Sequence, residues 1–424
     1  MNKNFIILVL VFGMMIVGFV SGATGNVKID KNLLEKFEEL QNQDEGKIRV
    51  LIKLKNESEA PSDYFGIFNK KETSEKINID KSSINKEARG YVSAYISKKD
   101  LEELKTNKFI ESVSVEQSYH ILLQDSVDIM NMSYAWNLEK NNLNLTGSGQ
   151  TVCIIDTGVN YSHPDLGGGY GNDTNFSYKI IGGWDFCGND GDCAEEDGDP
   201  MDVEGHGTHV SGIVAASGSI TGTAPNTKIV MMKAANASGV FFTVNILLAI
   251  DWCVNNASKF NISVISMSLG GGLYDGYCDN DDASNIAMTN SINNAVANNI
   301  SVVVATGNDG NSTYIASPAC ITNATRVGAT NKTDGIASYS NRNFITKLFA
   351  TGSNINSTIM SGGYDSWSGT SMATPMVAGA IALINQYLSL SGQSKTPQEI
   401  ESVLNNTGEI LDDTAESGYN FSRI

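Results

Sequence analysis

Short apolar runs rich in β-branched residues recur through the second half of the chain and predict strands of a parallel sheet. Their nearly continuous apolar character is typical of strands that helices cover on both faces. The runs span residues 151–155, 228–232, 262–266 and 300–304. Between them, residues 244–256 and 283–297 carry apolar positions at helical spacing. This alternation predicts an α/β fold with a mostly parallel sheet and helices on both faces.

The first part of the chain has a different pattern. Apolar and polar residues alternate at 48–54, 91–96 and 109–115, which predicts strands with one buried face. Residues 97–104 have a capping-box start and helical spacing. We therefore expect a small α+β domain ahead of the α/β domain.

Charge separates the same two regions. Residues 23–121 hold 17 basic and 18 acidic side chains, whereas residues 122–424 hold 11 and 29. This difference places a domain boundary near residue 121, with one domain at 24–121 and the other at 122–424. The net charge of −18 would repel nucleic-acid phosphates and anionic lipid, so we expect neither nucleic-acid binding nor a stable membrane partner.

Residues 1–23 have the pattern of a secretory signal peptide. Lys3 precedes an apolar run from Phe5 to Val20, and the small residues Ser21, Gly22 and Ala23 follow it. A retained membrane anchor is the alternative, because the run is only slightly shorter than a membrane span. We expect a secreted protein, with retention at the cell surface as the second outcome.

Three segments carry candidate chemistry. Asp156 directly follows the first apolar strand, at the sheet edge where open α/β proteins build their sites. His206 and Ser371 each lie in a glycine-containing turn that leads into an apolar helix. A serine hydroxyl needs a base to become a nucleophile, and histidine oriented by a carboxylate is the suitable base. The dipole of a helix N-terminus would also favour negative charge at the serine.

These segments resemble the three motifs of the subtilisin-like serine protease family, the subtilases, in the chain order Asp, His, Ser. The motifs are Asp156-Thr157-Gly158, His206-Gly207-Thr208-His209 and Gly369-Thr370-Ser371-Met372-Ala373-Thr374-Pro375. The resemblance implies a serine endopeptidase whose catalytic triad is Asp156, His206 and Ser371. No organic cofactor is expected for this chemistry.

The resemblance also assigns roles to residues between the motifs. It implies that Ser268, Leu269 and Gly270 bind the substrate backbone, and that Asn308 donates a hydrogen bond to the oxyanion of the tetrahedral intermediate. Ala316 matches the small residue at the base of the principal pocket. A small residue there predicts a preference for bulky apolar or aromatic side chains.

The first domain resembles the inhibitory propeptide of this family. The resemblance implies a ferredoxin-like chaperone at residues 24–121 whose extended tail occupies the active-site cleft and inhibits the enzyme from within the same chain. The expected cleavage falls near Tyr119–Asp125. Residues 122–424 would then be the subtilisin-like catalytic domain of a self-processing zymogen that acts on proteins or peptides.

Acidic residues cluster at 185–204, which hold nine acidic and no basic side chains. Two interpretations stay open, a structural calcium site and a solvated acidic loop. A second calcium site at Asp165 is not expected, because the loop at 217–223 is short. The three-residue spacing of His206 and His209 could suggest zinc, but no H-E-x-x-H motif is present, so a buried structural role is expected for His209.

Six cysteines fit an exported chain. We predict the disulfides Cys187–Cys193 and Cys278–Cys320, and expect Cys153 and Cys253 to be free and buried, with a third bridge as the alternative. For the N-x-S/T sequons, surface glycosylation and Asn-rich polar loops remain equal alternatives. These sequons include Asn144, Asn172, Asn236, Asn311 and Asn356.

Two other functions fit the motifs less well. A non-catalytic binding protein on the same fold would lack a triad residue, and all three residue types are present. An α/β-hydrolase esterase or lipase would carry its serine in G-x-S-x-G, ahead of the histidine. Ser371 lacks the second glycine and follows His206. The sequence therefore favours a secreted serine endopeptidase.

Overall fold

The chain forms two compact units, Met1–His120 and Ile121–Ile424, and the division in the sequence falls next to the predicted domain boundary. The computed structural model describes residues 19–20, 27–39, 46–55, 70–88, 91–115, 130–188 and 196–424. Most of the predicted signal segment and the whole predicted cleavage region lie outside these ranges. The roles assigned to the two domains stay predictions.

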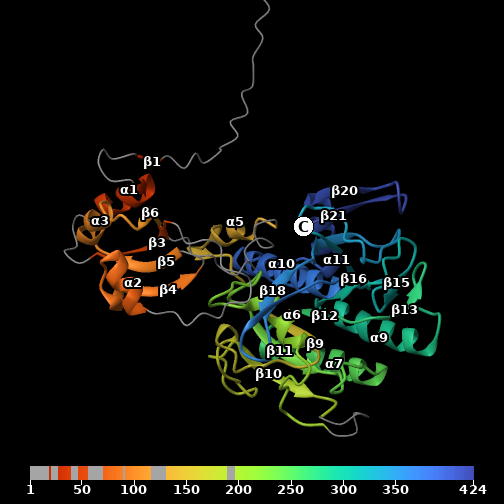
Figure 1. The fold of residues 1–424 in the computed structure, drawn as a ribbon. Helices are drawn as coiled ribbons and strands as arrows, with labels where there is room; N and C mark the ends of the chain where they lie inside the picture. Colours follow the sequence, from red (N-terminus) through yellow and green to blue (C-terminus); the bar gives the residue numbers. More distant parts are fainter. Residues whose placement is uncertain are drawn as a thin grey trace, which may run out of the picture. The chain divides into compact units, whose positions relative to one another are not determined.

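The larger unit contains a nine-stranded sheet that is parallel except at one edge (Figure 1). Only the last pair, β21 and β20, is antiparallel. The strand order is β10 (Ile180–Asp185), β11 (Lys228–Lys233), β9 (Thr151–Asp156), β12 (Ile262–Met267), β14 (Ser301–Ala305), β16 (Thr325–Thr330), β17 (Leu348–Thr351), β21 (Tyr419–Arg423) and β20 (Glu409–Asp413). The predicted parallel α/β sheet is confirmed.

Helices cover both faces of this sheet. Along β9, Val152 and Ile154 belong to one hydrophobic core, whereas Cys153 and Ile155 belong to the other. Because successive side chains of a strand point to opposite faces, each core lies on its own side of the sheet. The first core includes α6 (His206–Ala215), α10 (Thr370–Leu390) and α11 (Pro397–Thr407), and the second includes α7 (Thr243–Asn255), α8 (Ala257–Phe260) and α9 (Ala283–Ala297).

Helix α10 is a core helix. Among the described residues it alone is long and apolar enough to cross a membrane, but 72% of its most apolar stretch is buried. Its first turn carries Ser371, and Pro375 stands inside the helix. The same helix therefore contributes to the core and presents the predicted nucleophile.

Short hairpins and turns surround the central sheet. Two of them, the pairs β13–β15 and β18–β19, contribute to the candidate site described below. The bounds are α5 (Met132–Trp136), β7 (Glu139–Lys140), β8 (Leu143–Asn144), η2 (Pro164–Leu166), β13 (Gly271–Tyr274), β15 (Ile315–Ser317), β18 (Ile355–Thr358) and β19 (Tyr364–Trp367).

The smaller unit is α+β, as predicted. Its strands β6, β3, β5 and β4 lie in that order and pair antiparallel, with α2 between β3 and β4 and α3 between β5 and β6, which is a ferredoxin-like βαββαβ arrangement. Ser97 and Asp100 form the predicted capping box of α3. The bounds are β1 (Phe19–Val20), β2 (Lys28–Asp30), α1 (Lys31–Glu39), β3 (Ile48–Leu54), α2 (Lys70–Ile77), η1 (Lys81–Ser83), β4 (Ile84–Ala88), β5 (Tyr91–Ile96), α3 (Lys98–Leu104) and β6 (Ile110–Val115).

The disulfides confirm one sequence prediction and correct another. Cys278 is bonded to Cys320, as predicted. The expectation that Cys153 and Cys253 are free was wrong, because α7 packs on the face of β9 to which Cys153 points and brings the two Cα atoms within 6.3 Å. Cys187 is also disulfide-bonded, and its predicted partner, Cys193, lies outside the described residues.

Candidate active site

Asp156 and His206 form a hydrogen-bonded pair at the carboxyl end of β9. The Asp156 side chain is buried, and its Oδ1 lies 2.8 Å from Nδ1 of His206 and 2.8 Å from the backbone nitrogen of Thr157. His206 is the first residue of α6, and 23% of its side chain is exposed. Because Nδ1 is engaged, the nitrogen available for another partner is Nε2.

Close packing of α6 against the loop after β9 holds this pair in place. A Cβ atom on Gly207 would lie 2.1 Å from the carbonyl oxygen of Gly158, so only glycine allows this approach. Gly205, immediately before the helix, has a φ of 117°, which glycine adopts readily and other residues rarely adopt. The glycines of the His206 motif thus allow the imidazole to approach Asp156.

A second buried carboxylate, Asp202, binds the same two elements. Its Oδ1 accepts hydrogen bonds from the hydroxyl of Thr157 at 3.1 Å and from the backbone N–H groups of Glu204 and Gly205. Its Oδ2 accepts hydrogen bonds from the backbone N–H of Thr208, at 2.9 Å, and from the Thr208 hydroxyl. Asp202 therefore joins the end of β9 to the first turn of α6.

The carboxylates around His206 raise its pKa. Burial has the largest single effect and lowers the pKa, but the charges of Asp156, Glu204 and Asp202, together with the hydrogen bond to Asp156, outweigh it. The pKa of His206 is therefore held above its ordinary value of 6.5. A higher pKa makes the neutral imidazole a stronger proton acceptor.

His209 has the buried structural position that the sequence predicted. Its ring stacks on Trp367 with centroids 4.3 Å apart, and its Nε2 lies 3.1 Å from the carbonyl oxygen of Asp365. Burial lowers the pKa of His209 to about 4, so the ring is neutral at physiological pH. The ring of Trp367 also lies 6.5 Å from that of His206, which links the β18–β19 hairpin to the site.

Ser371 is the second residue of α10 and is bonded reciprocally to Ser268. The Ser371 hydroxyl donates to the carbonyl oxygen of Ser268 at 3.2 Å, and the Ser268 hydroxyl donates to the carbonyl oxygen of Ser371 at 2.8 Å. In an α-helix that second carbonyl would accept from the residue four positions on, but Pro375 has no N–H. Ser268 therefore supplies the donor that the proline removes.

Asn308 lies beside the N-terminus of α10 with its amide orientation determined. Its Oδ1 accepts hydrogen bonds from the backbone N–H of Thr370 at 2.8 Å and from the Thr370 hydroxyl at 3.0 Å. This leaves Nδ2 free to donate elsewhere. A Cβ atom built on Gly369 would lie 3.4 Å from Nδ2 of Asn308 and 3.6 Å from the backbone nitrogen of Ser371, so these two N–H donors lie close together.

The predicted substrate-binding residues line one cleft with Ser371 and Asn308. This cleft has a volume of about 730 Å³. A Cβ atom on Gly270 would lie 2.9 Å from the side chain of Ala316, so the two walls are closely packed there. The cleft lining includes Ser268, Leu269, Gly270, Asn308, Ala316 and Ser371.

A second cleft, of about 780 Å³, shares part of this lining. Phe241, Leu269 and Gly270 line both clefts. Ile246 and Met288 add apolar surface to the second cleft.

A family model supports the resemblance of the motifs. The model described as the subtilase family matches residues 147–422, well over half of the chain. The chain belongs to the subtilase family. The predicted family is thus confirmed.

Similar proteins include several named proteases. This subtilase is 32% identical over 76% of its length to alkaline serine exoprotease A of Vibrio alginolyticus and 36% identical over 69% to a thermophilic serine proteinase of Bacillus sp. strain AK1. It spans 56% and 63% of the lengths of these two relatives, less than two thirds of each. It is also 34% identical to thermitase of Thermoactinomyces vulgaris over 66% of this chain and 86% of thermitase.

A solved structure, described as that of a cold-adapted subtilisin-like serine proteinase, has a similar fold. It matches this subtilase with a TM-score of 0.54 and 32% sequence identity, over 67% of this chain and 91% of that one. The predicted subtilisin-like fold class is therefore confirmed.

The acidic segment at residues 185–204 is described only in part, at 185–188 and 196–204. Within those residues, no group of three His, Cys, Asp or Glu side chains could hold a metal ion. Asp199 instead accepts hydrogen bonds from the hydroxyl of Tyr161 and the backbone N–H of Met201. Residues 189–195 lie outside the described ranges, so both interpretations of the whole segment, a calcium site and a solvated acidic loop, stay open.

Asp165, the carboxylate considered for a second calcium site, is buried and already hydrogen-bonded. Its Oδ2 accepts hydrogen bonds from the backbone N–H of Ile220 at 2.9 Å and from the hydroxyl of Tyr364 at 3.0 Å. His163 begins the adjoining turn, where its Nδ1 accepts from the backbone N–H of Asp165. These contacts give Asp165 a structural role in this subtilase.

Sequence reasoning missed two polar residues that organise the site. Asp202 was counted only as one of nine acidic residues, although its place four positions before His206 was a usable signal. Asn341 was not singled out, because its contacts with the loop around Asn308 are made across more than 30 residues of sequence.

Proposed function

We propose that this subtilase is a serine endopeptidase that hydrolyses peptide bonds in proteins or peptides. The observation that carries the proposal is the hydrogen bond between Asp156 and Nδ1 of His206. That bond orients the imidazole so that its second nitrogen can serve a serine hydroxyl. Ser371, on the neighbouring helix, opens onto a cleft large enough for a peptide side chain.

Each residue has a distinct role in the proposed reaction. Ser371 attacks the peptide carbonyl while His206 accepts its proton, and His206 then gives that proton to the leaving amine. Water, deprotonated by the same imidazole, then cleaves the ester on Ser371 and releases the acid product and the free serine. Asp156 keeps the imidazole oriented and stabilises its charged form. The side-chain amide of Asn308 and the backbone N–H of Ser371 bind the oxyanion. To reach His206, the Ser371 hydroxyl must turn away from the Ser268 carbonyl that it contacts in this structure.

No organic cofactor is needed in this proposal, because the chain itself supplies nucleophile, base and oxyanion donors. Replacing Asn308 with alanine should lower kcat by about 10²–10³-fold, the range measured for such a donor in subtilisin. Steady-state kinetics on a chromogenic peptide measure the loss. An unchanged kcat would remove Asn308 from the proposed mechanism.

For specificity, we propose that the cleft beside Ala316 accepts a bulky apolar or aromatic side chain. The methyl group of Ala316 lines the cleft and leaves its volume open. A panel of peptides that differ only in the residue before the scissile bond tests this. Higher kcat/KM for Phe, Tyr or Leu is expected, and a profile dominated by Arg or Lys would refute it.

We also propose that the enzyme is secreted as a zymogen that removes its own first domain. Support comes from the signal-like residues 1–23, from the separate ferredoxin-like unit, and from relatives named as an exoprotease and an extracellular protease. In this proposal residues 24–121 assist folding and inhibit the enzyme until they are cut away.

The decisive experiment compares wild type with Ser371→Ala by intact mass and casein hydrolysis. Ser389→Ala, at the exposed far end of the same helix, is the matched control. Wild type and the control should lose residues up to the predicted boundary near 121 and digest casein, whereas Ser371→Ala should stay full length and inactive. Casein hydrolysis by Ser371→Ala would refute the proposed activity, and normal trimming of an inactive Ser371→Ala would refute self-processing alone.

A further inference from the structure

The loop that carries Asn308 is bonded along its length to one distant segment, residues 339–342. Three backbone hydrogen bonds of 2.8–3.0 Å connect the two. They run from Asn341 N to Gly307 O, from Gly310 N to Tyr339 O and from Arg342 N to Asn311 O. The position of Asn308 therefore depends on where this segment lies.

The Asn341 side chain adds three more bonds to the same loop. It is fully buried, and its Oδ1 accepts from the backbone N–H groups of Asp309 at 2.9 Å and Asn311 at 3.0 Å. Its Nδ2 donates to the carboxylate of Asp309 at 2.8 Å. One side chain thus holds the backbone immediately after Asn308 in a single conformation.

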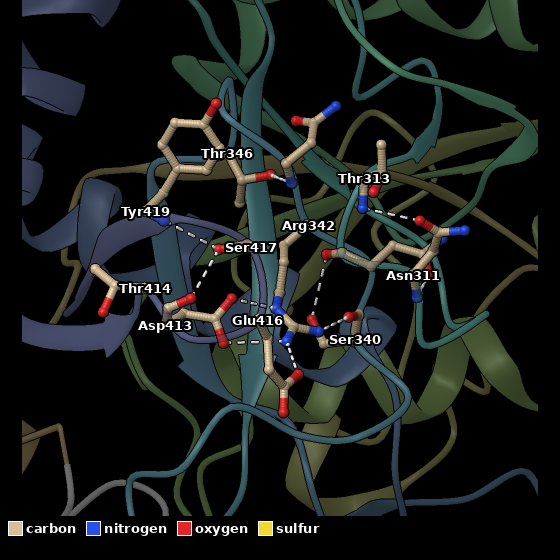
Figure 2. A network of polar contacts seen from close by, with 12 residues as sticks. Asn311, Thr313, Ser340, Arg342, Thr346, Asp413, Thr414, Glu416, Ser417 and Tyr419 are labelled. Atoms are coloured by element: carbon tan, nitrogen blue, oxygen red, sulfur yellow. Dashed lines mark hydrogen bonds and ion pairs between the residues drawn. The ribbon is translucent and has the colours of Figure 1, made fainter.

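Arg342 connects the other side of the segment to the C-terminal hairpin, β20–β21. Its buried guanidinium makes two hydrogen bonds to Asp413, at 2.8 and 3.0 Å, and a further one to Glu416. Figure 2 shows Arg342 between these carboxylates and close to Ser340 and Asn311. Two parallel bonds to one carboxylate determine direction as well as distance, so the hairpin supports the segment from outside.

We propose that Asn341 and the Arg342–Asp413 pair are positioning residues that keep the amide of Asn308 aimed at the oxyanion. None of the three side chains belongs to the proposed catalytic set. They act through the 307–311 loop. The inference rests on the proposed function, because it requires Asn308 to stabilise the transition state.

The test is a double-mutant cycle between Asp413→Asn and Asn308→Ala, read as kcat and KM. Asp413→Asn should lower kcat by up to about 10²-fold, as small displacements of catalytic groups can, and leave KM unchanged. In the Asn308→Ala background the same change should have no further effect, because the amide that it positions is gone. Asp412→Asn is the matched control, since the exposed Asp412 side chain is hydrogen-bonded to Thr414 alone within the described part of the chain.

Two further variants guard against a trivial result. Arg342→Lys keeps the charge but cannot form the two parallel bonds, so it should give a smaller kcat loss and serves if Asp413→Asn does not fold. Asn341→Ala should also lower kcat in enzyme that keeps Asn308, and should have no further effect in the Asn308→Ala variant. Urea unfolding of each variant shows that the folded state persists under assay conditions.

The outcomes separate this inference from the proposed function. Equal kcat losses in both Asn308 backgrounds, or no loss with Asp413→Asn or Arg342→Lys, would overturn the positioning role while the catalytic proposal stands. An unchanged kcat for Asn308→Ala alone would overturn the oxyanion role of Asn308 and the inference with it.

Discussion

Replacing Asp202 with asparagine tests how a buried carboxylate holds the proposed catalytic pair together. In the wild type this carboxylate accepts five hydrogen bonds from the end of β9 and the first turn of α6. Asparagine has one acceptor oxygen, which can keep the three donors at Oδ1. Its NH₂ group would then face the backbone N–H of Thr208, which would lose its acceptor.

The expected cost follows from these contacts. Leaving the buried Thr208 N–H without an acceptor costs about 1–3 kcal/mol. Losing a negative charge near the N-terminus of α6 adds about 0.3–1 kcal/mol. We therefore expect Asp202→Asn to lower the free energy of unfolding by roughly 1–4 kcal/mol.

The same change should move the pH profile. Asp202 is one of the charges that raise the pKa of His206, so removing its charge lowers that pKa. Since the neutral imidazole is the proposed base, activity rises as the pH passes the pKa, and the acid limb of kcat/KM should shift to lower pH. The free energy of unfolding depends on pH in the opposite direction to activity. Protonated His206 stabilises the fold below about pH 6.5, and this contribution is lost as the pH rises through the raised pKa. In Asp202→Asn this stabilisation by protonated His206 should be smaller, because the pKa is raised less.

The assay separates the two effects. Urea unfolding is measured in a Ser371→Ala background to prevent self-digestion, and kcat/KM is measured between pH 5 and 9 in active enzyme. Asp199→Asn, an exposed acidic residue nearby that does not contact His206, is the control. An unfolding free energy within about 0.5 kcal/mol of wild type, together with an unmoved acid limb, would refute the reasoning.

Two further predictions concern Ser268 and the disulfides. Ser268→Ala should lower kcat by about 2- to 12-fold, which corresponds to a hydrogen bond of 0.5–1.5 kcal/mol, and adding Pro375→Ala should recover part of the loss by restoring an N–H for the Ser371 carbonyl. Steady-state kinetics test this, and no loss with Ser268→Ala would contradict it. Replacing both Cys153 and Cys253 with alanine opens a loop of 100 residues and should cost about 4.7 kcal/mol in the chain-entropy model. Removing the Cys278–Cys320 disulfide opens a loop of 42 residues and should cost about 3.9 kcal/mol. Urea unfolding without a reducing agent measures both losses, and a larger loss for Cys278–Cys320 than for Cys153–Cys253 would count against this model.

The central fold could be predicted because its strands have two buried faces. Along β9, Val152 and Ile154 face one core and Cys153 and Ile155 the other, so the sequence shows an unbroken apolar run. The hairpin formed by β20 and β21 gave no such signal. Residues 409–413 include both exposed and buried positions, and three of the five are acidic. A short, mostly acidic stretch of this kind looks the same in the sequence as a surface loop.

The candidate site was predictable where chemistry is local to a motif. The glycines and the apolar stretches around His206 and Ser371 predicted helices with these side chains at their N-termini. His206 is the first residue of α6, and Ser371 is the second residue of α10. The Cys278–Cys320 disulfide was predicted, but other pairings between distant segments were not. The Cys153–Cys253 disulfide and the contacts of Ser268 with Ser371 depend on how helices pack on the sheet, and no local pattern of residues encodes that packing.

Covalent labelling by phenylmethanesulfonyl fluoride tests the central claim most directly, because this reagent sulfonylates an activated serine hydroxyl much faster than an ordinary one. Intact mass and peptide mapping of the mature enzyme should show one added group, on Ser371, and complete loss of peptidase activity. His206→Ala should prevent the labelling. Modification of another serine, or equally fast labelling of Ser371 in His206→Ala, would contradict the account.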